Sequence, residues 1–133
     1  MNISQYPKPE QIAALVTSTE TGPVVMVNLL KFKARADAPH VGISGMEAYA
    51  KYAKAMVGIV EGGGGRMIWS GRVTGMVIGE SDVDFDMIAL MEYPSRQAFA
   101  QVVADARVQE IAVHRAAGLD GQWLIAATTA DSL

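Results

Sequence analysis

The chain of 133 residues contains no cysteine, and its only imidazoles are His40 and His114. Without cysteine it has no disulfide scaffold, no thiolate zinc site and no cysteine nucleophile. The lack of cysteine is also compatible with a reducing compartment. Any metal site would consist mostly of carboxylate and other oxygen ligands, which favour hard cations over zinc or copper. The sequence therefore predicts a protein that works without a metal or other cofactor.

Basic clusters and long apolar runs are also missing from the chain. Eleven Lys and Arg stand against fourteen Asp and Glu, for a formal net charge of −3, and this balance disfavours nucleic acid as a partner. The first residues, MNISQYPKPE, lack the basic start and the apolar run of a signal peptide. No stretch approaches the roughly 20 apolar residues that span a bilayer. We expect a cytoplasmic protein with neither nucleic-acid nor membrane partners.

Apolar residues make up 50% of the chain, enough to fill one core, and they predict a single domain over residues 1–133. Residues 1–22 form an N-terminal helical extension, with a helix over 10–19, and residues 23–129 form the core. Periodicity predicts strands at 24–32, 66–79, 85–93 and 122–128, a helix at 44–61 and helical segments after Ser95. This βαββαβ order predicts an α+β, ferredoxin-like fold with a four-stranded antiparallel sheet.

Short signals mark the ends of the predicted helices. Ser44 and Glu47 fit a capping box at the start of the first core helix, and residues 33–43 before it form a long loop. Glycines at 62–65 end that helix. Gly118 followed by Leu119 fits a Schellman stop at the end of the last helix.

The first predicted core strand is apolar on both faces, although a ferredoxin-like sheet has helices on one face only. Alternation places Val25, Val27 and Leu29 on one side, with Val24 and Met26 on the other. An uncovered apolar face of this size normally marks an interface. The sequence therefore predicts a homodimer in which two open sheet faces pack together in a closed isologous arrangement.

Five runs along the chain carry a resemblance to a known family: VVMVNLLKF, EAYAKY, GGRMIWSG, MEYPSRQAF and HRAAGL. Their order and spacing over about residues 24–125 are similar to those of an uncharacterised family, domain of unknown function 1330. That family looks like a branch of the dimeric α+β barrel superfamily, which includes antibiotic-synthesis monooxygenases, muconolactone isomerases and EthD-like proteins. The resemblance implies a ferredoxin-like fold that pairs as a dimeric α+β barrel, and it implies no particular reaction.

Polar side chains within apolar strands are the first candidates for a ligand site. Asn28 interrupts a buried strand, so it either faces a ligand or makes a structural hydrogen bond to a neighbouring strand or helix. Arg66 offers paired donors for a carboxylate or enolate, and its alternative is an ion pair with Glu92 or Asp86. Alternation places Trp69 on the opposite face from Arg66, where packing is favoured over stacking on a ligand.

Candidate acids and bases lie at a strand end and on two helices. Glu92 beside Tyr93, with Tyr52 on the first core helix, combines a base with a tyrosine acid; the alternative roles are solvation and dimer contacts. His114 is either a general base or a solvated or carboxylate-paired histidine. Arg115 lies on the apolar stripe of its helix, where we expect it to bind a substrate or, more simply, to pair with an acid.

Together these residues predict a homodimer that binds a small anionic or aromatic metabolite, with cofactor-independent proton transfer or oxygenation as its chemistry. In this hypothesis Arg66 orients the anion, Asn28 donates a hydrogen bond, and Glu92 or His114 moves a proton. The alternative is a non-catalytic dimer whose polar residues are all paired internally. An apolar pocket in which Asn28 and Arg66 converge favours the first hypothesis. If Asn28, Arg66 and Arg115 are all satisfied by protein groups, and no cavity of about a few hundred Å³ exists, the catalytic hypothesis fails.

Overall fold

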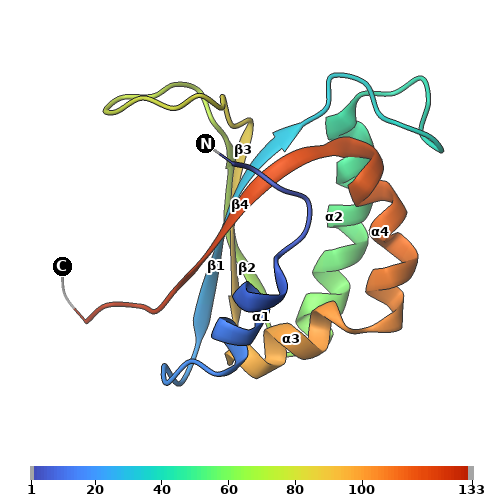
Figure 1. The fold of residues 1–133 in the computed structure, drawn as a ribbon. Helices are drawn as coiled ribbons and strands as arrows, with labels where there is room; N and C mark the ends of the chain where they lie inside the picture. Colours follow the sequence, from blue (N-terminus) through green and yellow to red (C-terminus); the bar gives the residue numbers. More distant parts are fainter. Residues whose placement is uncertain (1, 132–133) are drawn as a thin grey trace.

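Periodic apolar residues and helix caps divide the chain into four helices and four strands within residues 2–131, the part that this computed structural model describes (Figure 1). The N-terminal extension holds α1 (Pro9–Val16), which ends earlier than the sequence predicts. The core consists of β1 (Val24–Phe32), α2 (Gly45–Gly62), β2 (Arg66–Arg72), β3 (Met87–Tyr93), α3 (Arg96–Val103), α4 (Ala106–Gly118) and β4 (Leu119–Ala127).

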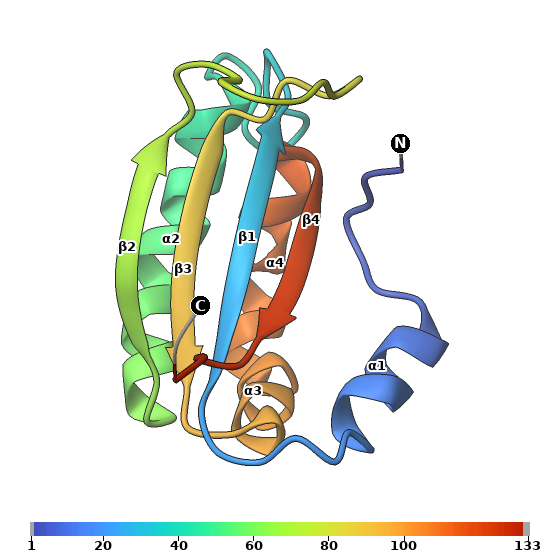
Figure 2. The same cartoon turned by 90° about the vertical axis from the view of Figure 1, so that its left-hand side faces the viewer.

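The four strands form one antiparallel sheet in the order β2-β3-β1-β4, with β1 and β3 in the middle. Element order and strand order together confirm the predicted α+β, ferredoxin-like fold. Helices α2 and α4 lie across one face of the sheet. Figure 2 looks onto the other face, which no helix within residues 2–131 covers, and which we call the open face.

Strand register assigns each side chain to the helix-covered face or to the open face. On β1 the residues Val24, Met26, Leu30 and Phe32 are at most 7% exposed, so the even-numbered positions face the helices. Pairing with β1 and β3 then places a largely apolar set on the open face: Val25, Val27, Leu29, Lys31, Arg66, Trp69, Ile88, Leu90, Glu92, Trp123 and Ile125.

The core lies between the helix-covered face and the helices. Val24 and Met26 of β1 pack there with Met56 and Val60 of α2 in one buried cluster. Burying each such side chain contributes about 1.5–3 kcal/mol, so this layer supplies much of the stabilising free energy. The open face makes no comparable contribution in a single chain.

A close approach of α2 and α4 fixes the end of α4. A Cβ atom on Gly118 would stand 2.2 Å from the carbonyl oxygen of Gly45, so only glycine allows this contact. At the same end of α2, Ser44 and Glu47 form the predicted capping box. The predicted Schellman stop is wrong, because Gly118 has no positive φ and Leu119 continues directly into β4.

β2 differs from the sequence prediction in length and in register. It ends at Arg72 instead of residue 79, and residues 73–86 form a long loop, which we call the arm. The register with β3 shifts between Met67 and Trp69, so Ile68 is the extra residue of a β-bulge. The bulge turns Trp69 to the open face beside Arg66, whereas strict alternation predicts opposite faces.

The N-terminal segment lies along the outer edge of β4. Ser4 pairs with Gln122 in an antiparallel bridge. The Gln5 side-chain nitrogen Nε2 donates to the carbonyl oxygens of Ala116 in α4 and Leu119 in β4. This segment therefore closes the side of the molecule where the sheet and α4 meet.

Candidate functional site

A row of polar side chains crosses the layer between the sheet and α4. Arg115 Nη2 donates to Gln122 Oε1 at 2.9 Å, and Gln122 Nε2 donates to Asn28 Oδ1 at 3.3 Å. Asn28 Nδ2 donates in turn to the carbonyl oxygens of Met26 at 3.3 Å and Ala89 at 3.2 Å. We call Arg115, Gln122 and Asn28 the polar row. It connects the last turn of α4 to β4 and β1.

Arg115 has neutral partners in this row. Its guanidinium carbon Cζ lies 5.4 Å from the centroid of the Tyr6 ring, and its hydrogen bond goes to the Gln122 amide. Among residues 2–131 no carboxylate forms an ion pair with Arg115, so the expected pairing with an acid is wrong. A half-buried guanidinium keeps its charge and offers five donors, which suits it to an anionic ligand.

Two tyrosines of α2, Tyr49 and Tyr52, lie near Arg115 of the polar row, and Tyr93 of β3 lies near these two tyrosines. The ring centroids of Tyr49 and Tyr52 are 5.4 Å apart, and charge interactions connect both residues with Arg115. Burial raises the pKa of Tyr49, Tyr52 and Tyr93 above the ordinary value of 10.0. Within the described residues, none of the three hydroxyls makes a hydrogen bond. At neutral pH they are therefore protonated phenols whose donors are unused by protein groups.

Arg66, Trp69 and Glu92 lie on the open face, on the opposite side of the sheet from the polar row. Arg66 Nε donates to Glu92 Oε1 at 3.0 Å, which is the ion-pair alternative for Arg66. Trp69 is 54% exposed, and its ring lies over Gly71. Asn28 and Arg66 therefore do not converge on one pocket, and both have protein partners.

His114 lies on α4 and contacts His40 of the loop at residues 33–43. Nδ1 of His114 is 2.6 Å from Nε2 of His40, so one nitrogen donates the shared proton and the other accepts it. The sequence predicts solvent, a carboxylate or a substrate as the partner of His114, and the structure provides a second imidazole. Because Glu92 faces the open side, the two predicted proton-transfer groups do not share a site.

Sequence reasoning missed Gln122 and Tyr6, which complete the surroundings of Arg115. Gln122 carries the same signal that identifies Asn28, because it is a polar residue on the helix-covered side of a strand. Tyr6 has no such signal. It precedes α1 in the N-terminal extension, and only the folded path of that segment brings it to Arg115.

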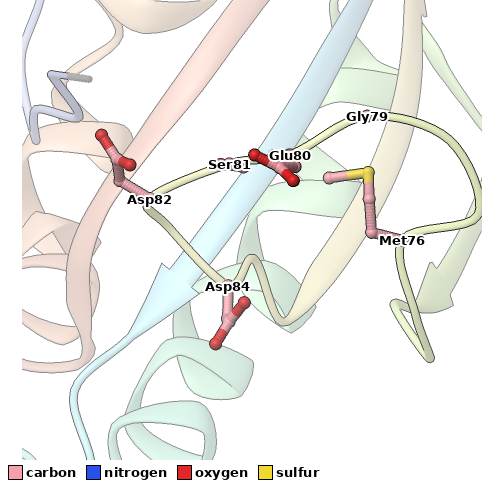
Figure 3. A pocket seen from close by; sticks show the side chains of 6 residues that line it. All are labelled: Met76, Gly79, Glu80, Ser81, Asp82 and Asp84. Atoms are coloured by element: carbon pink, nitrogen blue, oxygen red, sulfur yellow. The ribbon is translucent and has the colours of Figure 1, made fainter.

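Two surface hollows lie away from the polar row, and neither includes a candidate site residue. One, of about 620 Å³, lies within the arm, where the acidic side chains point in different directions (Figure 3); its lining is Met76, Gly79, Glu80, Ser81, Asp82 and Asp84. The other, of about 750 Å³, lies at the end of β1 and is lined by Lys31, Phe32, Lys33, Ala34, Ser44, Met46, Asp86 and Asp120. Residues 2–131 hold no group of three or more histidines and carboxylates placed to bind a metal ion.

Comparison with known protein families identifies the family of this chain. Residues 39–129, more than half of the chain, match the domain of unknown function DUF1330. The chain belongs to the DUF1330 family. No curated protein matches this DUF1330 chain significantly. Within the described residues, none of its helices has the length and apolar character needed to cross a membrane.

Solved structures share the fold of this DUF1330 chain. Two crystal structures of the protein RPA0582, described as of unknown function and from Rhodopseudomonas palustris, are each 31% identical to it with a TM-score of 0.88. They cover 98% and 99% of this chain, and it covers 99% and 98% of theirs; the second is of the methylated protein. At3g17210 from Arabidopsis thaliana is 22% identical to this chain, with a TM-score of 0.56. The match covers 83% of this chain and 99% of At3g17210, and it supports only a shared fold.

Proposed function

We propose that this DUF1330 protein is a homodimer that binds a small anionic or aromatic metabolite between its sheet and its helices. The observation that carries the ligand part is the Arg115 guanidinium, which is held by neutral groups near the phenols of Tyr49 and Tyr52, whose hydroxyls have no partner among residues 2–131. A carboxylate or phenolate supplies the missing counter-charge and accepts hydrogen bonds from the phenols.

The residues of the polar row have different roles in this proposal. Arg115 contacts the anionic group through the donors that Gln122 does not use. Gln122 positions the guanidinium, and Asn28 in turn fixes the orientation of the Gln122 amide. Tyr52 and Tyr93 donate hydrogen bonds to the ligand from α2 and β3. Asn28 is therefore a positioning residue, because its own side-chain atoms are occupied by protein groups.

The geometry favours binding over catalysis. A general acid works best with a pKa near the working pH, and burial moves the pKa of Tyr52 and Tyr93 in the opposite direction. Glu92 and His114, the expected proton-transfer groups, lie on different sides of the sheet. We therefore propose a ligand-binding role, and a proton-transfer or monooxygenase activity requires a group outside the polar row.

The open face supports the homodimer. Its apolar side chains include Trp69 and Ile125, which are 54% and 48% exposed in the single chain. Exposed apolar surface of this extent is costly in water and normally belongs to an interface. The same face packs against a second copy in the dimeric α+β barrel superfamily that the sequence resembles. We propose the same isologous pairing here, with residues 1–133 as one domain of each protomer.

A thermal-shift screen of small carboxylates, phenols and lactones tests the ligand part. A compound present at 100 times its Kd stabilises the folded state by about 2.7 kcal/mol, which raises Tm by roughly 10 °C for a chain of this size. Arg115→Gln removes the response, whereas Arg35→Gln, at an exposed arginine of the 33–43 loop, retains it. No response in the wild type, or an equal response in Arg115→Gln, contradicts the proposal and favours a dimer with internally paired polar residues.

Sedimentation equilibrium tests the dimer separately. The proposal predicts twice the chain mass of 14.2 kDa at micromolar concentration. A single-chain mass at that concentration contradicts the homodimer, and it leaves the ligand part to be decided by the thermal-shift screen.

A further inference from the structure

The tip of the arm is a cluster of apolar side chains that is left exposed in the described part of the chain, residues 2–131. Val77 is 94% exposed, Ile78 is 90% exposed and Met76 is 61% exposed. Single exposed apolar residues are ordinary on protein surfaces. Three adjacent ones at the end of a projecting loop gain nothing within this chain, so they point to burial against a partner.

The root of the arm is fixed on the sheet. The backbone nitrogen of Val73 donates to the carbonyl oxygen of Asp86 at 3.0 Å, which closes the loop at its base. Asp86 Oδ2 accepts from the backbone nitrogen of Phe32 at 2.8 Å. Phe85 lies against Trp123 of β4, with ring centroids 5.1 Å apart. The direction of the arm is therefore set before any partner binds, which lowers the entropic cost of association.

The arm leaves the sheet on the side of the open face. Figure 1 shows the helices on one side of the sheet and the arm projecting on the other. Lys31, an open-face residue, holds the arm there through a hydrogen bond from Nζ to the carbonyl oxygen of Asp84 at 2.9 Å. Sheets packed face to face lie about 10 Å apart. Residues 73–78 would span up to roughly 20 Å if extended, which is longer than this separation between packed sheets.

The open face alone is small for a stable interface. Four strands about 4.8 Å apart, seven to nine residues long at about 3.4 Å per residue, give the open face a flat outline of roughly 520 Å². A standard specific interface buries about 800 Å² on each partner. The arm supplies additional area on the same side of the molecule. In an isologous dimer each copy contributes one arm, so the gain occurs twice.

We infer that the arm is a clasp for a second copy of this chain, with Met76, Val77 and Ile78 of each copy packed on the flank of its partner's sheet. This inference rests on the proposed homodimer. It assigns to the arm the interface area that the open face does not supply. The occupant is a second copy because the two apolar surfaces of one chain, the open face and the arm tip, lie on the same side and complete one interface together.

The test compares two arm variants with a matched control by sedimentation equilibrium. Val77→Asp and Ile78→Asp each place a charge where the clasp buries an apolar side chain. Each is expected to weaken dimerisation about tenfold per arm, hence about a hundredfold in the dimer Kd. Val41→Asp, at a residue 80% exposed in the 33–43 loop beside α4, leaves the Kd unchanged. Because these side chains are exposed, circular dichroism should show the same fold in all variants.

The absence of cysteine allows a second readout at the tip. Ile78→Cys carries one nitroxide label per chain, and the clasp predicts that the label becomes immobile as the concentration rises through the dimer Kd. A wild-type dimer whose Kd is unchanged in both arm variants, or whose label stays mobile, overturns the clasp and leaves the homodimer standing. A monomeric wild type overturns both.

Discussion

Replacing Gly118 by alanine tests whether the contact of α2 with α4 positions the last turn of α4, which carries Arg115. The added Cβ would stand 2.2 Å from the carbonyl oxygen of Gly45 and 2.8 Å from the backbone nitrogen of Tyr49. Backbone atoms cannot rotate away, so the two helices must separate by about 1 Å. Overpacking of this kind costs up to about 3 kcal/mol, or roughly 12 °C in Tm for a chain of this size.

Gly58→Ala is the matched control within α2. A Cβ at this position meets nothing within 4 Å, and alanine is the better helix former by about 0.5–1 kcal/mol. Urea unfolding followed by circular dichroism should therefore show opposite signs for the two substitutions. If Gly118→Ala is as stable as the wild type, or more stable than Gly58→Ala, the helix contact does not fix α4 as we describe.

Three further predictions follow from single features. Ser44→Ala should cost about 1 kcal/mol in urea unfolding, because it removes the N-cap of α2; no loss contradicts the capping box. At a concentration below the dimer Kd, Arg66→Ala should change the free energy of unfolding by less than about 1 kcal/mol, since the ion pair of Arg66 with Glu92 is exposed in a single chain; a larger loss contradicts this. Absorbance at 295 nm should show Tyr49, Tyr52 and Tyr93 ionising at higher pH than in the urea-unfolded chain, and simultaneous ionisation refutes their burial.

The raised tyrosine pKa values also set the sign of the pH dependence. Above pH 10 the unfolded chain loses phenol protons that the folded chain keeps, so the folded state binds more protons there. This stabilising contribution is complete below about pH 10 and is lost as the pH rises above it. Urea unfolding between pH 8 and 11 should show that decline, and a constant or increasing free energy of unfolding contradicts it.

Much of the fold was predictable because its signals are local. The apolar, partly β-branched run at residues 24–32 identifies a central strand, and Ser44 with Glu47 identifies the start of α2 from hydrogen-bonding capacity alone. The bulge at Ile68 was not predictable in this way. It depends on how β2 pairs with β3, and that register reverses the face of Trp69 without changing the sequence pattern.

In the candidate site, too, local signals were predictable from the sequence and tertiary contacts were not. Asn28 was found because a polar residue within a buried strand needs partners, and the structure supplies them from β1, β3 and β4. The sequence did not predict the observed partners of Arg115 and His114. Both depend on segments distant in sequence, the N-terminal segment with Tyr6 and the loop with His40, whose positions follow from tertiary packing.

The guanidinium of Arg115 offers the most direct test of the proposed ligand site. Its Nε–Hε signal can be followed in ¹H–¹⁵N NMR spectra of the protein while the small carboxylates of the thermal-shift screen are added, with the signal assigned through Arg115→Lys. The account predicts a saturable shift of the Arg115 signal with a carboxylate that raises Tm, and no shift of the Arg35 signal. A carboxylate that raises Tm without moving the Arg115 signal, or no effect from any of them, contradicts it.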